Sequence, residues 1–374
     1  MADIKTHLRE LSVATTIGLF NANIEFQAKD LYDSRRFLSY AKKVISNDIS
    51  NANNLLDYTV FTGELQSIVD NGYKLGKKIY DSPYFIIRND APIKWLGNDT
   101  QKGDPIDITV GNYSFSLKEE SFILKNMGLY PLLNNLTGSN YARGLHVFST
   151  FAPAEYDAWF KYTWQYLVKY LSKGSTWELR KNSNVSKISL AGANTVILYY
   201  NGECSNVPVN ICTNADYMIH TTSKTREKVF SKWISDVIAY DPEYIRLKKL
   251  CSETAGKKVS DKINSEFCLD NVYDFFQIYS QEYYYAKTTS TETTILKVPS
   301  KANFSSVIEF KGCRYEVPSS QLNIISTFKN KKTNKILEFR NECRFSHGQF
   351  NGTPEAKMYV VRNTPLTELY EPLE

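Results

Sequence analysis

The chain has 374 residues, of which 45 are Lys or Arg and 40 are Asp or Glu, so its net charge of +5 permits a nucleic-acid partner without requiring one. With 42% hydrophobic residues, it is typical of a folded protein of one large or two ordinary domains, which excludes large-scale disorder. Its six cysteines are scattered without a C-x-x-C pair, and no stretch has the length and apolarity of a membrane span. We therefore expect a cytoplasmic protein with reduced thiols and no membrane partner.

The first part of the chain predicts helices followed by a strand. Apolar positions recur at helical intervals over residues 30–52, and residues 53–80 continue as a further predicted helix. The pattern of residues 84–88 is typical of a short strand. The buried stripe of the second helix can be formed by Leu56, Val60, Leu65, Ile68 and Val69.

A tight β-hairpin is predicted over residues 104–118. Gly111 and Asn112 separate two runs of alternating residues, and glycine readily adopts the positive φ that a two-residue hairpin turn requires. Successive side chains of a strand point to opposite faces. The apolar face would carry Ile106, Ile108, Val110, Phe115 and Leu117. The other face would carry Asp107, Thr109, Ser114, Ser116 and Lys118.

Asp107 and Lys118 would be diagonal neighbours across this hairpin, with Cα atoms roughly 7–8 Å apart. A carboxylate in this position can bind Mg²⁺, a cation that prefers oxygen ligands and keeps several waters. A lysine beside it can offset negative charge that develops on a phosphate. An Asp diagonal to a Lys is also a common surface ion pair, so the hairpin alone leaves both interpretations open.

The two residues resemble the active site of the PD-(D/E)xK nuclease superfamily, to which many type II restriction endonucleases belong. In that family an Asp on one strand and an acid-x-Lys on the next build the site, and Asp107 and Lys118 match the Asp and the Lys. Ser116 stands where the second acid is usual, and Ile106 stands where a Pro is usual. The predicted order of helix, strand, hairpin and helix, the last near residues 119–136, agrees with the common core of that family.

The departure at Ser116 leaves the second metal carboxylate open, because a hydroxyl is a much weaker Mg²⁺ ligand. Some family members supply this carboxylate from elsewhere, and the candidates here are Glu64, Glu119 and Glu120. We favour Glu64, because a helix packed near the hairpin could direct it to the same metal. Glu120 comes second, since strand alternation places it on the Lys118 face. The resemblance thus implies a catalytic set of Asp107, Lys118, Glu64 and Ser116, and a metal-binding set of Asp107, Glu64 and Glu120.

The middle of the chain contains two aromatic segments and a basic one. Residues 152–172 predict an aromatic helix, and residues 271–287 form a second aromatic cluster; core packing or a dimer interface is the usual role of both. Residues 187–200 predict a strand, a turn and a strand. Residues 217–239 predict an amphipathic helix with a basic face that could approach a phosphate backbone. Beyond Thr288 the chain consists of short β runs.

A polar loop joins two of these runs between Arg340 and Lys357. Its side chains suit base edges and phosphates, because Arg commonly reads guanine and Asn or Gln reads adenine. The segment is similar to a stretch near the carboxyl ends of some type II restriction endonucleases. A loop folded on itself through Asn and Ser side chains would have the same composition. The candidate DNA contacts are Arg344, Ser346, His347, Gln349, Asn351 and Lys357.

These observations predict an α/β fold: a restriction-endonuclease-like core with a central mixed β-sheet flanked by helices, plus a β-rich C-terminal region. Residues 1–240 would form the catalytic core and residues 241–374 the DNA-recognition region, with a single compact domain as the alternative. The sequence has neither a GxxxxGK[ST] loop nor a GxGxxG motif, so no nucleotide cofactor is expected.

The resemblance implies a type II site-specific deoxyribonuclease of a restriction–modification system. It would hydrolyse phosphodiester bonds of double-stranded DNA with Mg²⁺, and as a homodimer, since palindromic sites match a two-fold protein. Two alternatives stay open. Ser116 favours a non-catalytic DNA-binding protein with a degenerate nuclease fold. In a structural or interaction protein, the hairpin ion pair would be incidental.

Overall fold

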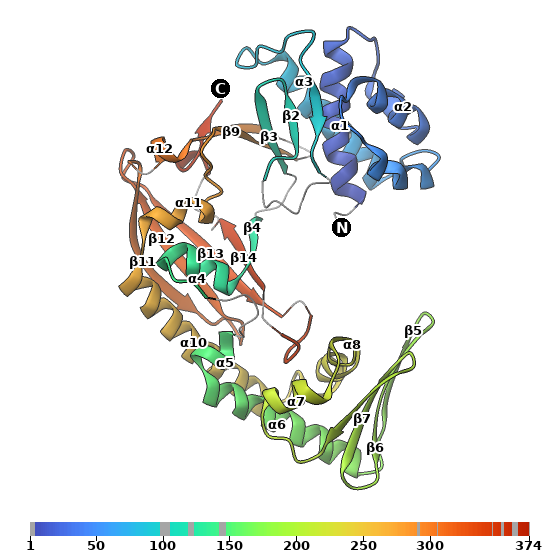
Figure 1. The fold of residues 1–374 in the computed structure, drawn as a ribbon, viewed down its shortest axis with the longest axis vertical. Coiled ribbons are helices and arrows are strands. Elements are labelled where there is room, and N and C mark those ends of the chain that lie inside the picture. Colours follow the sequence, from blue (N-terminus) through green and yellow to red (C-terminus); the bar gives the residue numbers. More distant parts are fainter. Residues whose placement is uncertain are drawn as a thin grey trace. The chain divides into compact units, whose positions relative to one another are not determined.

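The chain folds into two compact units in a computed structural model (Figure 1). Unit 1 consists of Met1–Phe122, Gln277–Val307 and Pro365–Glu374, and unit 2 consists of Ile123–Phe276 and Ile308–Thr364. The structure describes residues 4–97, 105–118, 123–141, 147–289, 292–304, 306–345, 347–352, 355–360 and 366–373. None of the helices within these residues is both long and apolar enough to cross a membrane.

Three helices of unit 1 pack together: α1 (Ile4–Asn21), α2 (Ser34–Val44) and α3 (Glu64–Asp81). α2 lies within the first predicted helical stretch, whereas α1 was not predicted. α1 and α3 run side by side, and a Cβ at Gly72 would lie only 2.4 Å from the Cβ of Ser12. Glycine therefore allows the two backbones to approach closely. Most of α1 is buried, so the polar residues on it are enclosed by the protein.

The helix predicted over residues 53–80 is divided in two. A 3₁₀ helix, η2 (Ser50–Asp57), comes first, and α3 starts only after Gly63, whose φ of 57° lies in the left-handed region. This conformation interrupts the helix where the periodicity alone predicted continuity. A shorter 3₁₀ helix, η1 (Ala28–Leu31), precedes α2. The predicted stripe is therefore only partly buried. On α3, Ile68 and Val69 are buried and Leu65 is half-buried. Before α3, Leu56 and Val60 are exposed.

A six-stranded mixed sheet completes unit 1, in the order β1-β2-β3-β9-β10-β15. Neighbouring strands are antiparallel except β3 and β9, which are parallel. The strands are β1 (Ile93–Trp95), β2 (Ile108–Val110), β3 (Tyr113–Lys118), β9 (Tyr283–Thr288), β10 (Thr293–Val298) and β15 (Glu371–Pro372). The short helices of this part of the chain are α12 (Lys301–Phe304) and η7 (Leu366–Glu368). The predicted strand at residues 84–88 is an irregular segment instead, and the strand begins at Ile93.

The predicted hairpin is confirmed in its register. Ile108 pairs with Phe115, and Val110 pairs with Tyr113. Gly111 has a φ of 55° while Asn112 does not adopt a positive φ, as a type II′ turn requires. The apolar face is buried at Ile108, Val110, Phe115 and Leu117, and Ile106 is half-buried.

The two units are interleaved along the sequence. Unit 1 leaves its sheet after β3 and returns at β9, and the intervening residues 123–276 belong to unit 2. A second excursion into unit 2, residues 308–364, separates β10 from β15. The expected boundary between residues 240 and 241 therefore does not separate the two units. The helix expected after the hairpin, near residues 119–136, is wrong in its first part: residues 123–128 form strand β4 of unit 2, and the helix begins only at Leu129.

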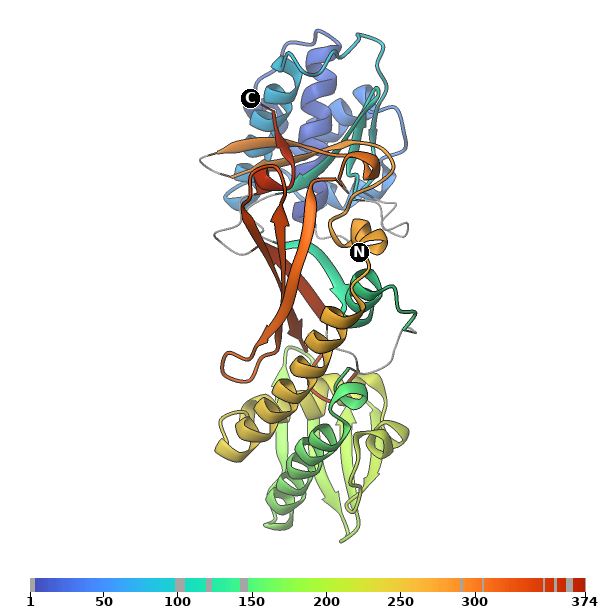
Figure 2. The same ribbon diagram turned by 90° about the vertical axis from the view of Figure 1, so that its left-hand side faces the viewer.

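A five-stranded antiparallel sheet organises one part of unit 2, in the order β11-β12-β13-β14-β4. Helices α4 (Leu129–Thr137), α10 (Pro242–Glu266) and α11 (Val272–Phe275) lie on one face of it (Figure 2). The predicted β-rich C-terminal region is thus confirmed. The strands are β11 (Ile308–Glu316), β12 (Asn323–Asn330), β13 (Ile336–Arg344), β14 (Glu355–Val360) and β4 (Ile123–Gly128), and the 3₁₀ helix η6 (Leu269–Asn271) precedes α11.

A four-stranded antiparallel sheet and an aromatic core organise the rest of unit 2. The strand–turn–strand predicted at residues 187–200 is confirmed as β6 and β7. The sheet consists of β5 (Trp177–Lys181), β6 (Asn184–Ala191), β7 (Thr195–Tyr200) and β8 (Glu203–Pro208). Beside it are the helices α5 (Val147–Phe151), α6 (Pro153–Ser172), α7 (Asn214–His220), α8 (Ser223–Thr225) and α9 (Ser231–Trp233), with π-helical turns η4 (Arg226–Phe230) and η5 (Ile234–Ile238). The predicted aromatic helix is α6, and it packs its rings into this core.

Candidate active site

Asp107 lies directly before β2, where the hairpin and the end of β1 hold it through three hydrogen bonds with backbone groups. Its N–H donates to the carbonyl of Phe115 and its carbonyl accepts from the N–H of Leu96, each over 2.8 Å. Its carboxylate oxygen Oδ2 accepts a third bond, of 2.6 Å, from the N–H of Leu117. The carboxylate is therefore fixed in place by the hairpin that the sequence predicts.

Lys118, the last residue of β3, lies beside this carboxylate. Its Nζ is 3.9 Å from Oδ2 of Asp107, and the two side chains are 26% and 18% exposed. The expected proximity of Asp107 and Lys118 is thus confirmed. At this distance the ammonium stabilises negative charge on Asp107 without forming a short hydrogen bond, so both groups keep bonding capacity for a ligand.

A second carboxylate, Glu10 on α1, completes the cluster. Glu10 is only 3% exposed, and its Oε2 accepts a 2.7 Å hydrogen bond from the indole N–H of Trp95. Burial, and then repulsion by Asp107, raise the pKa of Glu10 to about 8, against the opposing effects of the Trp95 bond, Arg9 and Lys118. Without a further cation, Glu10 therefore carries a proton at neutral pH.

The pKa of Asp107 is raised as well. Burial is the largest cause, and the charge of Lys118, the N–H of Leu117 and the charge of Arg9 oppose it. Two neighbouring carboxyl groups with raised pKa values are characteristic of functional sites, because a divalent cation can relieve both desolvation and repulsion.

Gly97 provides the space for Glu10. A Cβ at this position would lie 2.0 Å from Oε2 of Glu10 and 2.6 Å from Nε1 of Trp95. His7 contacts the other side of Trp95, with ring centroids 5.2 Å apart in an edge-to-face arrangement. The carboxylate, the indole and the Gly97 backbone are thus packed together, so the position of Glu10 depends on all three.

The two carboxylates fit Mg²⁺ by their chemistry. This ion is commonly bound by one or two protein carboxylates, with waters and substrate phosphates as the remaining ligands. The described part of the chain contains no group of three or more His, Cys, Asp or Glu residues that could hold a metal ion. Asp107 and Glu10 therefore suit a hard cation whose remaining ligands are water and phosphate. They suit less well a cation whose ligands must all come from the protein.

The other predicted residues of this site have different positions. Glu64 is exposed at the start of α3 and forms an ion pair of 2.6 Å with Lys5, so the structure does not bring it to Asp107. Ser116 is buried, and its hydroxyl lowers the pKa of Asp107. No well-formed hydrogen bond joins this hydroxyl to a described residue. Glu119 and Glu120 lie outside the described residues.

Glu10 was missed because no helix was predicted before residue 30. A signal was present, however, since Glu10 directly precedes an uncharged run from Leu11 to Ile24. A long uncharged segment is often buried, and it can bury the acid next to it. Because a glutamate is rarely buried without a partner, such an acid is a candidate functional residue.

The sheet brings a second lysine to Lys118. The parallel register of β3 and β9 pairs Lys118 with Lys287, and paired residues of neighbouring strands project to the same face. Like charges in such positions repel each other. Only the fold reveals this pairing, because 169 positions of sequence separate the two lysines.

The predicted DNA-binding loop belongs to unit 2, and much of it is anchored. Nε of Arg226 donates to the Asn351 side chain over 2.8 Å, and His347 lies 3.5 Å from Glu227. The hydroxyl of Ser231 donates to the backbone carbonyl of Gln349 over 3.4 Å. The loop is therefore held against the helical segment 226–231.

Two further predicted DNA contacts lie on strands. Arg344 ends β13 and pairs with Glu342 over 3.0 Å. Lys357 on β14 stands opposite the same Glu342 in the strand register. Arg344 is thus partly neutralised within the protein, and Lys357 has an acidic cross-strand neighbour. Ser346 lies outside the described residues.

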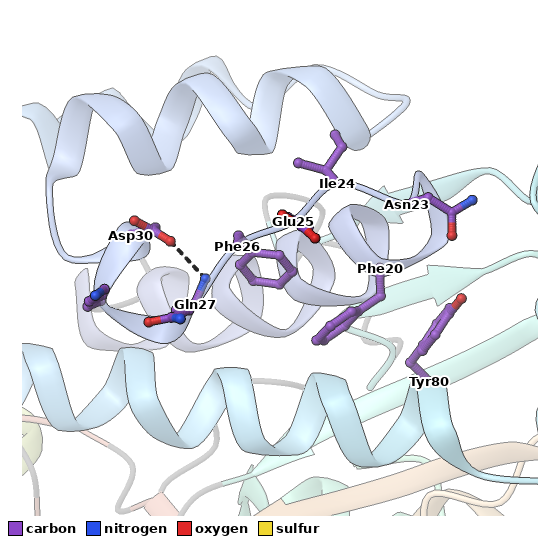
Figure 3. A pocket seen from close by; sticks show the side chains of 9 residues that line it. Phe20, Asn23, Ile24, Glu25, Phe26, Gln27, Asp30 and Tyr80 are labelled. Carbon is purple, nitrogen blue, oxygen red and sulfur yellow. Dashed lines mark hydrogen bonds between the residues drawn. The ribbon is translucent and has the colours of Figure 1, made fainter.

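A separate open groove of 790 Å³ lies at the end of α1 (Figure 3). The rings of Phe20 and Tyr80 stack there with centroids 5.4 Å apart. The backbone N–H of Gln27 donates to Asp30 over 2.8 Å. The lining contains none of Asp107, Glu10 and Lys118, so this groove is not part of the carboxylate site.

Comparison with protein-family models, with curated proteins and with solved structures finds no match to this chain.

Proposed function

We propose that the chain is a Mg²⁺-dependent, sequence-specific endonuclease of double-stranded DNA, of the type II restriction kind. Its active centre would be formed by Asp107, Glu10 and Lys118. The observation that carries the proposal is the meeting of a buried carboxyl group, a half-buried carboxyl group and a lysine at one end of the hairpin.

The resemblance to the PD-(D/E)xK superfamily supports this proposal at two points. A helix, a strand and a hairpin follow one another as α3, β1 and β2–β3, whereas strand β4 stands between the hairpin and the next helix, α4. Glu10 also offers the second carboxylate that Ser116 cannot supply. We accordingly propose a restriction-endonuclease-like core for unit 1, with the acid moved from the strand to α1.

Each residue has a distinct role in the proposed reaction. Asp107 and Glu10 would hold Mg²⁺, which supplies a coordinated water of lowered pKa and neutralises charge on the phosphate. Lys118 would orient the attacking water and offset the charge that develops as the phosphodiester bond breaks. Trp95 and Gly97 would keep Glu10 in place, and Lys287 would contact a phosphate next to Lys118.

The rival proposal of a non-catalytic DNA-binding protein rested on Ser116. With Glu10 beside Asp107, the change at Ser116 no longer implies a missing carboxylate, so we favour catalysis. DNA recognition by Arg344, His347, Gln349, Asn351 and Lys357, and a homodimeric assembly, remain parts of the proposal.

The test is cleavage of a long unmethylated DNA of known sequence, with Mg²⁺ or with EDTA. We expect discrete fragments that depend on Mg²⁺ and are lost in Asp107→Asn, which keeps the shape of the side chain. Glu64→Gln is the matched control, since Glu64 is an exposed acid of the same unit, and it should cleave as the wild type does.

A continuous smear of fragments would support nuclease activity but contradict its sequence specificity. The proposal would be overturned if both methylated and unmethylated DNA stayed intact with Mg²⁺ or with Mn²⁺. Retention of duplex binding in that case would favour the non-catalytic alternative.

A further inference from the structure

Three tyrosines form a row along the outside of α6 in unit 2. Tyr162, Tyr166 and Tyr170 are spaced four residues apart, which places them on one face of the helix about 6 Å from each other. All three are half-buried, and the ring centroids of Tyr162 and Tyr166 are 6.3 Å apart. The row therefore presents successive aromatic rings at a protein surface.

The protein holds these rings in place from behind. The buried ring of Trp233 lies 6.4 Å from the ring centroids of both Tyr166 and Tyr170. The hydroxyl of Tyr162 donates a hydrogen bond of 2.8 Å to Asp241. Rings that are already ordered lose little conformational entropy when a ligand stacks on them.

A parallel row of exposed polar residues accompanies the tyrosines. Gln165, Lys169 and Lys173 follow Tyr162, Tyr166 and Tyr170 by three residues each, and together the two rows line a groove of 330 Å³. No described ion pair engages Lys169 or Lys173. The groove thus combines an aromatic wall with two available ammonium groups.

We propose that this groove on α6 binds a single-stranded nucleic acid, with bases against Tyr166 and Tyr170 and phosphates at Lys169 and Lys173. Proteins that bind single strands without sequence preference combine these two features, stacking rings and a cationic track. A duplex would offer only its phosphates, because its bases are stacked on each other. The site goes beyond the proposed cleavage and does not require it.

The acidic residues nearby place the strand at one end of the groove. Asp241 accepts from Tyr162, and Glu243 also acts on that tyrosine, so the Tyr162 end carries negative charge. The phosphates would accordingly follow the half of the row that contains Lys169 and Lys173.

The test is binding of a fluorescent twelve-residue oligothymidylate to the full chain in EDTA, followed by fluorescence anisotropy. Loss of one stacked base corresponds to about five- to 150-fold weaker binding, so we expect an effect of this size in Tyr166→Leu and Tyr170→Leu. Tyr166→Phe keeps the ring and should bind like the wild type, which separates stacking from folding defects. Lys169→Gln and Lys173→Gln should each reduce the salt dependence by about 0.7 in the logarithmic slope.

Lys257→Gln, an exposed lysine on α10, is the control for general charge and should leave binding unchanged. Equal affinity for a duplex, with loss in the lysine variants but not in Tyr166→Leu, would overturn the proposal in favour of a phosphate-only surface. Equally tight binding of polyglutamate would overturn it in favour of an acidic protein partner. Asp107→Asn should retain oligothymidylate binding, so failure of the proposed nuclease and failure of this site are distinguishable.

Discussion

The indole N–H of Trp95 donates a 2.7 Å hydrogen bond to Oε2 of Glu10, within a site where Glu10 is 3% exposed. One neutral donor does not offset the removal of a carboxylate from water. The pKa of Glu10 therefore rises to about 8 through burial and the nearby charge of Asp107. Glu10 consequently holds a proton at neutral pH. In the proposed function Mg²⁺ would replace this proton, and the exchange can be measured without cleavage.

The first prediction concerns stability against pH in the absence of metal. Between the ordinary pKa of Glu10, 4.5, and its folded value of about 8, the folded protein holds a proton that the unfolded chain has lost. The free energy of unfolding should therefore fall as pH rises through this range, by on the order of a few kcal/mol. Glu10→Gln removes this titration, so its melting temperature relative to the wild type should rise steadily from pH 5 to pH 8.5.

Thermal unfolding in EDTA at three pH values in this range checks the prediction. Mg²⁺ should stabilise the wild type at pH 8.5 and have little effect on Glu10→Gln. Glu64→Gln is the control, because Glu64 lies outside the Glu10 cluster and its replacement should leave the pH dependence caused by Glu10 in place. The assignment of Glu10 fails if the difference in melting temperature between Glu10→Gln and the wild type does not change with pH.

The second prediction concerns Gly97. In Gly97→Ala the new methyl group would lie 2.0 Å from Oε2 of Glu10, so the carboxylate must move. Displaced ligands and their supports typically cost about 10- to 100-fold in metal affinity, and we expect the Mg²⁺ concentration for half-maximal cleavage to rise accordingly. The pH dependence of stability described above should weaken in the same variant.

Gly128→Ala is a suitable control in unit 2, since its nearest contact would be 3.4 Å, to Pro131. Equal Mg²⁺ requirements in Gly97→Ala and the wild type would show that the position of Glu10 does not matter for metal binding.

The hairpin could be predicted because its signal is local. Alternation on both sides of Gly111 sets the register, and the register sets the proximity of Asp107 and Lys118. Such a signal needs only about fifteen residues of sequence. The β-rich C-terminal region was predictable for the same reason.

Glu10 and Lys287 could not be placed from the sequence, because long-range packing brings them to the hairpin. α1 meets the hairpin across nearly a hundred residues, and β9 pairs with β3 only after the excursion of the chain through unit 2. The same excursion explains why the expected boundary between residues 240 and 241 does not separate the two units. Glu64 was a reasonable choice by helix proximity, but the parallel course of α1 and α3 directs it to Lys5 instead.

The third prediction separates the two lysines at the end of the sheet. Lys118→Met should reduce cleavage strongly and leave duplex affinity within a few fold, because Lys118 lies beside the carboxylate. Lys287→Met should mainly weaken duplex binding and lower the logarithmic salt slope by about 0.9, as loss of one phosphate contact does. Fluorescence anisotropy with Ca²⁺ in place of Mg²⁺ measures duplex affinity. Cleavage with Mg²⁺ measures the reaction rate.

Lys74→Met, an exposed lysine on α3, controls for general charge. An unchanged salt slope in Lys287→Met would remove Lys287 from the substrate contacts, whatever its effect on rate.

The fourth prediction concerns Phe350, which anchors the predicted DNA-binding loop of unit 2. Its side chain is fully buried, with ring centroids 4.5 Å from Trp159 and 5.3 Å from Phe160. Its φ of 62° lies in the left-handed region, which a bulky residue adopts only when packing compensates the strain. Phe350→Ala should therefore destabilise unit 2 by about 3–5 kcal/mol.

Urea unfolding followed by tryptophan fluorescence reports mainly on unit 2, because Trp159, Trp164, Trp177 and Trp233 lie there and only Trp95 lies in unit 1. Ile336→Ala is the control, since Ile336 is 50% exposed and should change stability by less than about 0.5 kcal/mol. In folded Phe350→Ala the anchored side chains of His347 and Asn351 should lose their positions, so duplex binding should weaken while the Mg²⁺-linked stabilisation of unit 1 persists. Duplex affinity equal to that of the wild type would mean that this loop does not contact DNA.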